Sequence, residues 1–499
     1  MQIQAYRYGM RHEVLNDLLG TLRCLRVLNL SEYDIKLLPD SINNLIHLRH
    51  LNMSSTSILV LPESICTLYN LQELLLANCK SLAVLPINLG RLIKLTHLDL
   101  EGTNLRKMPA QMGNLKDLKI LDKFVLHIEH DVLELKKLQN LRGTLCIGSQ
   151  TCIGFIVYGT DGSALEANIL KDKKFLTEVV MNWVYLPDES GKGEPSLDRR
   201  LSRYTQLERE LLHKLQPHTN LEVLTIKYYR GTTFPDWPNF YSSSALVYLR
   251  LFKCKNCITL PPLGQLPSLR ELHIEGLNGV KSIGPEFYGD SGIKPFRSLL
   301  LLLVDRMLGL EEWSYIGDVN HELELFPQLE IVSFPDGRLH APNLTELDIH
   351  SCQRLRSMPK HMNTLLPCLQ QLWISNCQEL ESFPEGRLPS KLQLLEITSR
   401  KLIANHKHWG LDRLTCLAHL SLVCQEYEEH VELFPEEGVY LPNTLTFLRI
   451  CNFLNLKTIN QNGTWAPELS SNLGDDELSC SPMLARGIWA PQLSSNLED

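Results

Sequence analysis

The chain has 499 residues, a formal net charge of -8 and 44% hydrophobic residues. A chain of this length usually forms roughly two to four domains, although an array of repeats can make one body of the same size. The acidic charge is mild and spread out. This argues against a nucleic-acid-binding protein, since such proteins normally carry a basic stripe. No stretch approaches the roughly 20 continuous apolar residues of a membrane span.

Residues 1–20 are predicted to be an N-terminal connector. This segment has neither the apolar core nor the small-residue cleavage site of a secretory signal. The 14 cysteines are scattered along the chain, which favours reduced thiols over a disulfide framework. We therefore expect a cytoplasmic protein, with the nucleus or the periphery of a membrane as further locations.

Residues 21–125 contain a regular repeat of leucines. Units such as "LRVLNL", "LRHLNM" and "LTHLDL" follow one another, with their second leucines 23, 23, 24 and 23 residues apart. These leucines are Leu28, Leu51, Leu74, Leu98 and Leu121. In the first four units a leucine or methionine then stands directly before a proline, at Pro39, Pro62, Pro86 and Pro109. This spacing is typical of leucine-rich repeats.

The repeat unit contains a strand, a turn and a returning segment. Apolar residues alternate within L-x-L, so a short strand turns them to one side and its polar residues to the other. Proline then helps to end the strand, because it fixes φ and lacks an N–H group. In "PESICTL" the apolar residues are three apart, which suits a helical or 3-10 turn. We predict an α/β repeat solenoid, a leucine-rich-repeat horseshoe with a concave parallel β-sheet and an irregular, 3-10 and helical convex side.

The rest of the chain is less regular. Residues 126–220 are predicted to hold irregular repeats with two weak strands, near Thr144 and Leu176, and an exposed loop at "PDESGKGEPSLDRR". The motif returns over residues 221–460 at intervals of 23 to 45 residues, and the spacing near Leu325 to Leu344 suggests a lost unit. Residues 461–499 are predicted to be a poorly ordered tail with a duplicated "WAPxLSSNL". In total we expect about 16 strands.

The sequence lacks the motifs of common catalytic and metal sites. No P-loop, H-E-x-x-H or Gly-x-Ser-x-Gly motif occurs. "HIEH" (His127 to His130) and "HKH" (His406 to His408) are interpreted as solvated loop histidines. We therefore predict no enzyme, no metal site and no cofactor.

The lone C-x-x-C at Cys254 to Cys257 lacks the second pair that a zinc site needs. Cys254 lies three residues after Leu251, the position that Cys79, Cys352 and Cys377 fill in other units. We predict that Cys254 is a structural cysteine, packed under the turn that ends its strand.

The outward residues of the predicted strands are the candidate functional residues. Neighbouring strands bring these positions side by side, and the second half of the array places there Tyr, Trp, Arg and His, which are enriched at binding hot spots. A large ring such as Trp373 on an open sheet is costly unless something covers it. The predicted protein-binding residues are Tyr228, Tyr248, Arg250, Phe252, His273, Glu275, Asp348, His350, Gln371, Trp373, Glu396 and Arg449.

Several strings resemble a known family. "LRCLRVLNLSEYDIKLLPDSINNLIHLRHLN", "LQPHTNLEVLTIKYYRGTTFPDWP", "CKNCITLPPLGQLPSLRELHIEG" and "SIGPEFYGD" are similar to plant intracellular nucleotide-binding leucine-rich-repeat disease-resistance proteins of the coiled-coil subclass. The resemblance covers roughly residues 14 to 459. It implies that the array recognises a pathogen effector or a guarded host protein, and that it folds back on a nucleotide-binding switch and helps to hold it inactive.

The resemblance does not extend to the whole receptor. This sequence contains no P-loop, so nucleotide binding and ATP hydrolysis are not carried over. Two interpretations stay open: part of a longer receptor, with the switch domain as a partner in cis, or a stand-alone product. Two rival classes of protein predict other features. An intracellular leucine-rich scaffold or adaptor unrelated to defence should stay regular throughout, and an extracellular receptor should show a signal peptide.

Overall fold

The computed structural model describes most of the repeat array. The described residues are 12–126, 129–148, 169–183, 205–206, 208–237, 239–289, 295–313, 341–358, 362–383, 388–406, 409–428, 433–434, 441–453 and 458–459. They all belong to one structural unit, Met1–Asn460. The predicted tail, the exposed loop and the segment near Leu325, where the spacing suggests a lost unit, lie outside the described residues.

The regular repeats form a five-stranded parallel sheet. Its strands are β1 (Val27–Asn29), β2 (His50–Asn52), β3 (Glu73–Leu75), β4 (His97–Asp99) and β5 (Ile120–Leu121), paired in sequence order. Equivalent repeat positions are register partners, so Leu28 pairs with Leu51 and Leu51 with Leu74. Before them, within the predicted connector, helix α1 (His12–Thr21) buries Leu15 and Leu19 against the first repeat.

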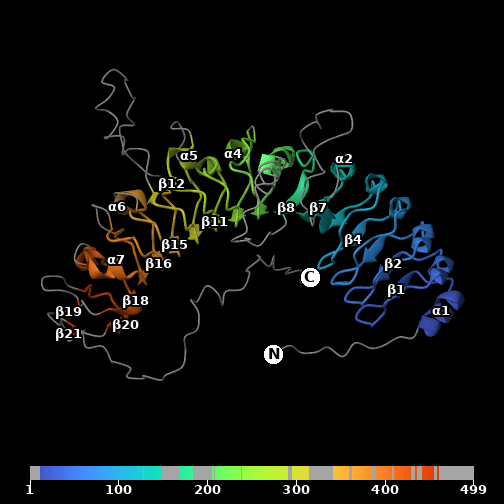
Figure 1. Ribbon diagram of the computed structural model, residues 1–499, viewed down its shortest axis with the longest axis horizontal. Coiled ribbons are helices and arrows are strands. Elements are labelled where there is room, and N and C mark those ends of the chain that lie inside the picture. The colour runs from blue at the N-terminus through green and yellow to red at the C-terminus, as the bar shows by residue number, and fades with distance from the viewer. Residues whose placement is uncertain are drawn as a thin grey trace, which may run out of the picture. The chain divides into compact units, whose positions relative to one another are not determined.

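A second parallel sheet of twelve strands continues the array (Figure 1). Its strands, in order, are β6 (Lys123–Val125), β7 (Arg142–Gly148), β8 (Phe175–Asn182), β9 (Val223–Lys227), β10 (Tyr248–Phe252), β11 (Glu271–Glu275), β13 (Leu301–Asp305), β15 (Glu346–His350), β16 (Gln371–Ser375), β17 (Leu394–Ile397), β18 (His419–Glu428) and β20 (Phe447–Phe453). The weak strands predicted near Thr144 and Leu176 are present as β7 and β8. β13 pairs directly with β15 across the longest interval.

Helical turns lie on the opposite side of the repeats from the strands (Figure 1). They comprise η1 (Asp40–Asn44), η2 (Glu63–Thr67), η3 (Leu89–Arg91), η4 (Met112–Asn114), α2 (Glu129–Lys137), α4 (Phe240–Ser243), η5 (Leu263–Gln265), α5 (Pro285–Tyr288), α6 (Met362–Leu365), α7 (Arg400–Ala404) and η8 (Leu411–Arg413). Two small parallel pairs join β12 (Ser282–Ile283) to β14 (Glu312–Trp313) and β19 (Leu433–Phe434) to β21 (Thr458–Ile459). The prediction of strands on one side and short helical turns on the other is confirmed.

The core is a continuous stack of the repeat leucines, with a column of cysteines beside it. Leu51, Leu74 and Leu98 are fully buried, because an isolated repeat has no other way to remove its apolar face from water. Cys79, at the predicted position, is also buried, and its thiol donates to the carbonyl of Met53 at 3.0 Å. Burial raises the pKa of Cys254 to about 12. Cys254 is therefore the packed structural cysteine that was predicted.

One histidine prediction is wrong. His406 was expected in a solvated loop, but it is fully buried. Its Nδ1 lies 3.0 Å from the carbonyl oxygen of Ile403, and its ring packs against Phe434 with centroids 4.9 Å apart. Trp409 completes the cluster at 6.3 Å. A hydrogen bond to a local carbonyl satisfies the imidazole, which allows the ring to serve as core.

Candidate functional site

The outward side of the twelve-stranded sheet, here called the strand face, carries the predicted residues in three columns. Tyr248, Arg250 and Phe252 alternate with the buried Leu249 and Leu251 along β10. The parallel register repeats this alternation across the neighbouring strands. The middle column contains Arg250, His273, Leu303, Asp348, Trp373, Glu396, Ser421 and Arg449. The third column contains Lys227, Phe252, Glu275, Asp305, His350 and Ser375.

Aromatic and basic side chains meet around β9 and β10. The rings of Tyr228 and Phe252 form an edge contact with centroids 5.4 Å apart. The guanidinium of Arg250 lies over the Phe252 ring at 4.8 Å. On the next strand, the ring of His273 lies 5.0 Å from that of Tyr248. These half-buried rings pack around the Arg250 side chain and leave part of it accessible to solvent.

A chain of ion pairs crosses four strands of the same face. Arg250 binds Glu275 at 2.9 Å, and the second carboxylate oxygen of Glu275 lies 3.6 Å from Arg306. Arg306 also contacts Asp305 at 3.2 Å, and Asp305 accepts a hydrogen bond of 2.8 Å from His350. The structure thus joins three predicted residues, Arg250, Glu275 and His350, into one network with Asp305 and Arg306.

Sequence reasoning missed Asp305 and Arg306. The unit "LLLLLV" contributed no residue to the predicted set, whereas Asp305 occupies an outward position at the end of its strand and Arg306 follows it. Carrying the third column through every unit would have found Asp305. Its pairing with His350 depends on β13 and β15 being neighbours, which the interval of 45 residues obscures.

Burial and neighbouring charges shift the protonation of this face. Burial raises the pKa of Asp348 to about 6; His350 opposes this shift, and Asp305 and Glu396 reinforce it. The hydrogen bond to Asp305 raises the pKa of His350. Burial and the charge of Arg250 lower the pKa of His273 to about 4. At neutral pH His273 is therefore an uncharged imidazole beside a guanidinium.

The remaining candidates continue the columns towards the C-terminal strands. Gln371 and Trp373 lie on β16, and neighbouring side chains leave Trp373 half-buried. Its register partners are Asp348 and Glu396. Burial raises the pKa of Glu396, and the charge of Arg449 partly offsets that shift. Arg449 itself is exposed on β20.

Comparison with known proteins finds similar leucine-rich repeats in plant proteins. The model of R13L1/DRL21 leucine-rich repeats matches residues 132–277, and a model of a leucine-rich repeat region matches residues 10–153. A putative disease resistance RPP13-like protein 1 from Arabidopsis thaliana is 39% identical over 252 residues, which is 47% of this chain and 23% of the relative. A putative disease resistance protein RGA4 from Solanum bulbocastanum is 43% identical over 52% of this chain and 24% of the relative.

The chain contains leucine-rich repeats similar to those of plant disease resistance proteins. It spans about a quarter of the length of the curated relatives it matches. Among solved structures, the leucine-rich-repeat protein LIC12759 of Leptospira interrogans is similar, with a TM-score of 0.42 and 22% identity. That match covers 80% of this chain and 85% of that one.

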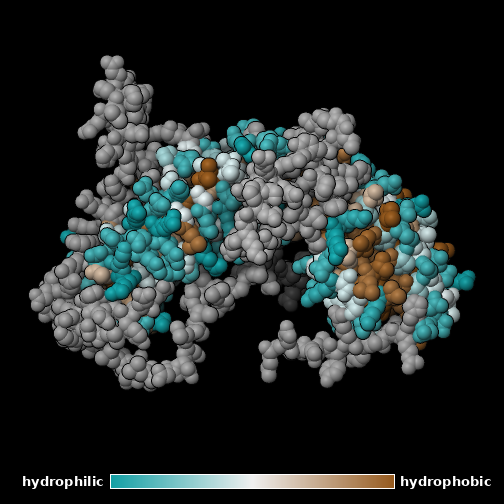
Figure 2. Space-filling view, in the orientation of Figure 1, coloured by the Kyte–Doolittle hydropathy of each residue, from teal (hydrophilic) through white to brown (hydrophobic). Residues whose placement is uncertain are grey.

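The N-terminal repeats of this array carry apolar stripes that sequence reasoning missed. Leu37, Val60 and Val84 are joined by parallel β-bridges and are 52%, 47% and 38% exposed. A second stripe contains Ile46, Tyr69 and Ile93, which are all more than half exposed. Each of these residues directly follows the buried leucine that ends the helical turn of its unit. Figure 2 shows apolar residues gathered over these repeats. Alignment of the units alone would have revealed both stripes, since each lies at a constant repeat position.

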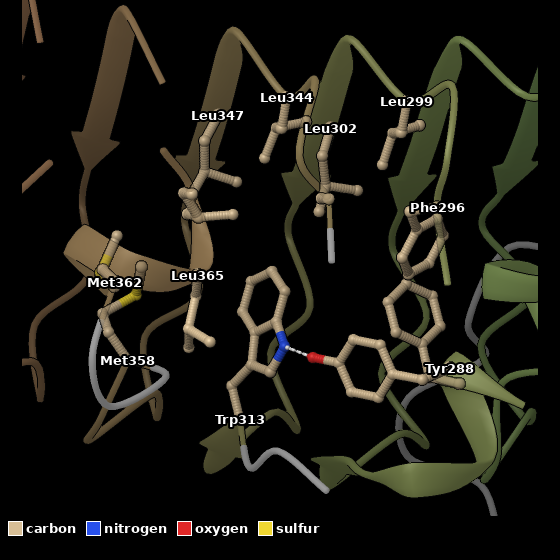
Figure 3. Close-up of a pocket in the computed structure, with 13 residues that line it drawn as sticks. Tyr288, Phe296, Leu299, Leu302, Trp313, Leu344, Leu347, Met358, Met362 and Leu365 are labelled. Carbon is tan, nitrogen blue, oxygen red and sulfur yellow. Dashed lines mark hydrogen bonds between the residues drawn. The ribbon is translucent and has the colours of Figure 1, made fainter. Parts of the chain in front are cut away.

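An apolar cavity of about 30 Å³ lies inside the stack between the repeats of β13 and β15 (Figure 3). It is lined by Leu302, Leu347, Met362 and other apolar side chains, and Trp313 Nε1 donates to the Tyr288 hydroxyl at 2.9 Å beside it. A site of this size with a wholly apolar lining has no partners for even one water. It is a packing gap where the repeat interval is longest.

Two features are absent from the described residues. Within them, no group of three or more His, Cys, Asp or Glu side chains is arranged to hold a metal ion. None of their helices has the length and apolar character needed to cross a membrane.

Proposed function

We propose that this array is the protein-recognition module of a plant immune receptor, and that its strand face binds a pathogen effector or a guarded host protein. The observation that carries the proposal is the half-exposed cluster of Tyr248, Arg250 and His273, whose side chains are of the types enriched at binding hot spots. The relatives named as disease resistance proteins support the link to defence.

The geometry favours a macromolecular partner over a small molecule. The candidate residues extend over successive strands from β9 to β20, so they present a broad surface. Partly buried ion pairs such as Arg250–Glu275 fix the positions of the side chains before binding. Pre-positioned side chains lose less conformational entropy on association, which raises affinity for a matching surface.

A second surface supports a contact in cis. Where the chain forms part of a longer receptor, we propose that the apolar stripes through Val60 and Tyr69 pack against its nucleotide-binding domain. Exposed apolar patches of this kind mark protein contacts. Binding at the strand face would then shift the receptor between two states, provided that the partner has different affinities for them.

Capture from plant extracts tests the proposal. The full chain and the variant Arg250→Ala/His273→Ala/Trp373→Ala are immobilised and exposed to extracts of infected and healthy leaves. We expect the wild type to retain an effector or a defence-associated host protein that the variant loses. Retention only of general signalling proteins, equally from both extracts, would favour an intracellular scaffold or adaptor.

A further inference from the structure

One position of the repeat unit has a left-handed backbone conformation, with positive φ. It lies four residues after the second leucine of a unit and has positive φ in eleven described units. Seven of these units use small or turn-forming residues there: Ser55, Asn78, Gly102, Gly276, Ser351, Asn376 and Asn452. Such residues tolerate this conformation best. Long side chains stand there in four units, at Glu32, Tyr228, Lys253 and Arg306.

Three of these four long residues gather at one place on the strand face. Tyr228, Lys253 and Arg306 directly follow β9, β10 and β13. Their φ angles are 58°, 52° and 50°. Each non-glycine residue held in this region costs backbone strain, and such strain concentrates at functional sites. The side chains, rather than the backbone, therefore explain why these residue types occupy the position.

These residues form part of a positively charged rim. We define the cationic rim as Lys227, Tyr228, Arg250, Phe252, Lys253 and Arg306, at the carboxyl ends of β9, β10 and β13. Lys253 and Arg250 lie 4.9 and 4.8 Å from the centroid of the Phe252 ring. Two carboxylates, Glu275 and Asp305, lie next to the rim and contact Arg250, Arg306 and His350. Four cationic side chains of the rim, Lys227, Arg250, Lys253 and Arg306, thus stand beside these two carboxylates, on a chain whose formal charge is -8.

Two unsatisfied donors lie beside the rim. Among the described residues, Arg250 Nε and His273 Nε2 are buried polar atoms with no hydrogen-bond partner. The nearest Glu271 oxygen is 3.9 Å from His273 Nε2, too far for a hydrogen bond. His273 Nδ1 lies 3.5 Å from the Tyr248 hydroxyl, and when that hydroxyl donates to Nδ1 the neutral ring carries its proton on Nε2. The two side chains are 35% and 23% exposed, so both reach the strand face although the two donor atoms themselves are buried.

We propose that the cationic rim binds an acidic segment of a protein partner, one carboxylate of which accepts hydrogen bonds from Arg250 and His273 while the segment's neighbouring charges face Lys253 and Arg306. This inference rests on the proposed function and specifies the chemistry of the partner. Aromatic rings at Tyr228 and Phe252 suit an aromatic or apolar side chain next to the acidic residue. A nucleic acid fits less well, because the interleaved Glu275 and Asp305 would repel successive phosphates.

Peptide binding to the full chain tests the inference. Fluorescence anisotropy would compare a labelled alternating Glu-Tyr peptide with its Gln-Tyr counterpart, which has the same rings and no charge. We expect about tenfold tighter binding of the Glu-Tyr peptide. The variant Lys253→Gly/Arg306→Gly should lose about tenfold in affinity for it, with a thermal midpoint that is unchanged or higher, because glycine relieves the strained backbone.

Matched variants separate binding from folding. Glu32→Gly relieves the same strain in the first repeat and should leave peptide affinity unchanged. Arg250→Lys keeps the charge but lacks the Nε donor, and should weaken binding about fivefold. Equal affinity for the two peptides, or an unaffected Lys253→Gly/Arg306→Gly variant, would overturn the inference. So would displacement of the Glu-Tyr peptide by single-stranded RNA at equal concentration. One combination of results separates this inference from the proposed function. If Arg250→Ala/His273→Ala/Trp373→Ala loses a captured partner but the wild type shows no preference for the Glu-Tyr peptide, the proposed function stands and only this inference fails.

Discussion

His350 on β15 donates a hydrogen bond of 2.8 Å to Asp305 on the neighbouring strand β13, and the two residues are register partners. The pair closes the ion-pair chain that begins at Arg250 and passes through Glu275 and Arg306. Residues that are 45 positions apart in sequence thus fix one another's orientation on the strand face. The same pair makes the stability of this face depend on pH.

Replacing His350 by glutamine should destabilise the protein more in mild acid than in mild base. The hydrogen bond raises the pKa of His350, so its stabilisation is complete below the unfolded value of about 6.5 and is lost as the pH rises through the native value. Asp305, Asp348 and Arg306 face the imidazole, and its side chain is 37% exposed. Solvent screening therefore limits the effect to about 0.5 kcal/mol.

Urea unfolding of wild type and His350→Gln at about pH 6 and about pH 8 measures this dependence. The difference between their midpoints should shrink at the higher pH. A difference that grows with pH would show that the imidazole is stabilised in its neutral form.

Replacing Asp348 by asparagine should stabilise the protein at neutral pH. Burial raises the pKa of this carboxyl to about 6, so holding it ionised at pH 7 costs free energy in the native state. Its native pKa lies above the unfolded value, so stability falls as the pH rises through about 6. We expect Asp348→Asn to add about 1–2 kcal/mol at pH 7 and little at pH 4. Destabilisation at pH 7 would mean that the charge interaction with His350 outweighs desolvation.

The buried pair Glu208–Arg230 should respond differently to single and double replacement. Arg230 Nε donates to Glu208 at 2.7 Å, and the Glu208 side chain is fully buried. Glu208→Ala leaves a buried guanidinium without its partner and should cost about 3–5 kcal/mol, whereas Glu208→Met/Arg230→Met should recover most of that loss. Denaturation midpoints of wild type, Glu208→Met, Arg230→Met and Glu208→Met/Arg230→Met complete the double-mutant cycle that measures the coupling. Equal losses of stability in the single and double variants would show that the unpaired buried guanidinium is not the cause of the destabilisation.

Two glycines should respond oppositely to alanine. Gly102 has φ of +66°, and an added Cβ would lie 2.5 Å from the Asn78 amide oxygen, so Gly102→Ala should cost about 1–2 kcal/mol. Gly20 lies in helix α1 with open space around its Cα. Gly20→Ala should therefore add about 0.5–1 kcal/mol. Thermal melting compares the two, and a gain in both variants would refute the steric argument at Gly102.

The repeat made much of the fold predictable from sequence. Alternation around Leu51 and Leu74 requires strands with one buried side, and the proline after each strand marks the turn. Even the weak strands β7 and β8 followed from short apolar alternation. Helix α1 was not predicted, because the burial of Leu15 and Leu19 depends on the repeat that covers them.

The candidate site was only partly predictable. Alternation showed that Arg250 and His273 point outward, but it contains no information about which side chains pair. The contacts of Arg306 with Glu275 and Asp305 depend on β11 and β13 being adjacent and on a left-handed residue that turns Arg306 back over the sheet. The burial of His406 likewise required the ring of Phe434, 28 residues further along the chain.

The central claim is that the strand face around β10 to β16 binds the protein partner. The most direct measurement is the affinity of a captured partner for wild type and for Arg250→Ala/His273→Ala/Trp373→Ala, with circular dichroism to verify folding and Leu272→Asp as an unfolded reference. We predict a loss of about 100-fold, since these residues would form the centre of the interface. Unchanged affinity in the folded triple variant, with a loss instead in Val60→Ser/Tyr69→Ser, would place the partner on the apolar stripes and contradict the account.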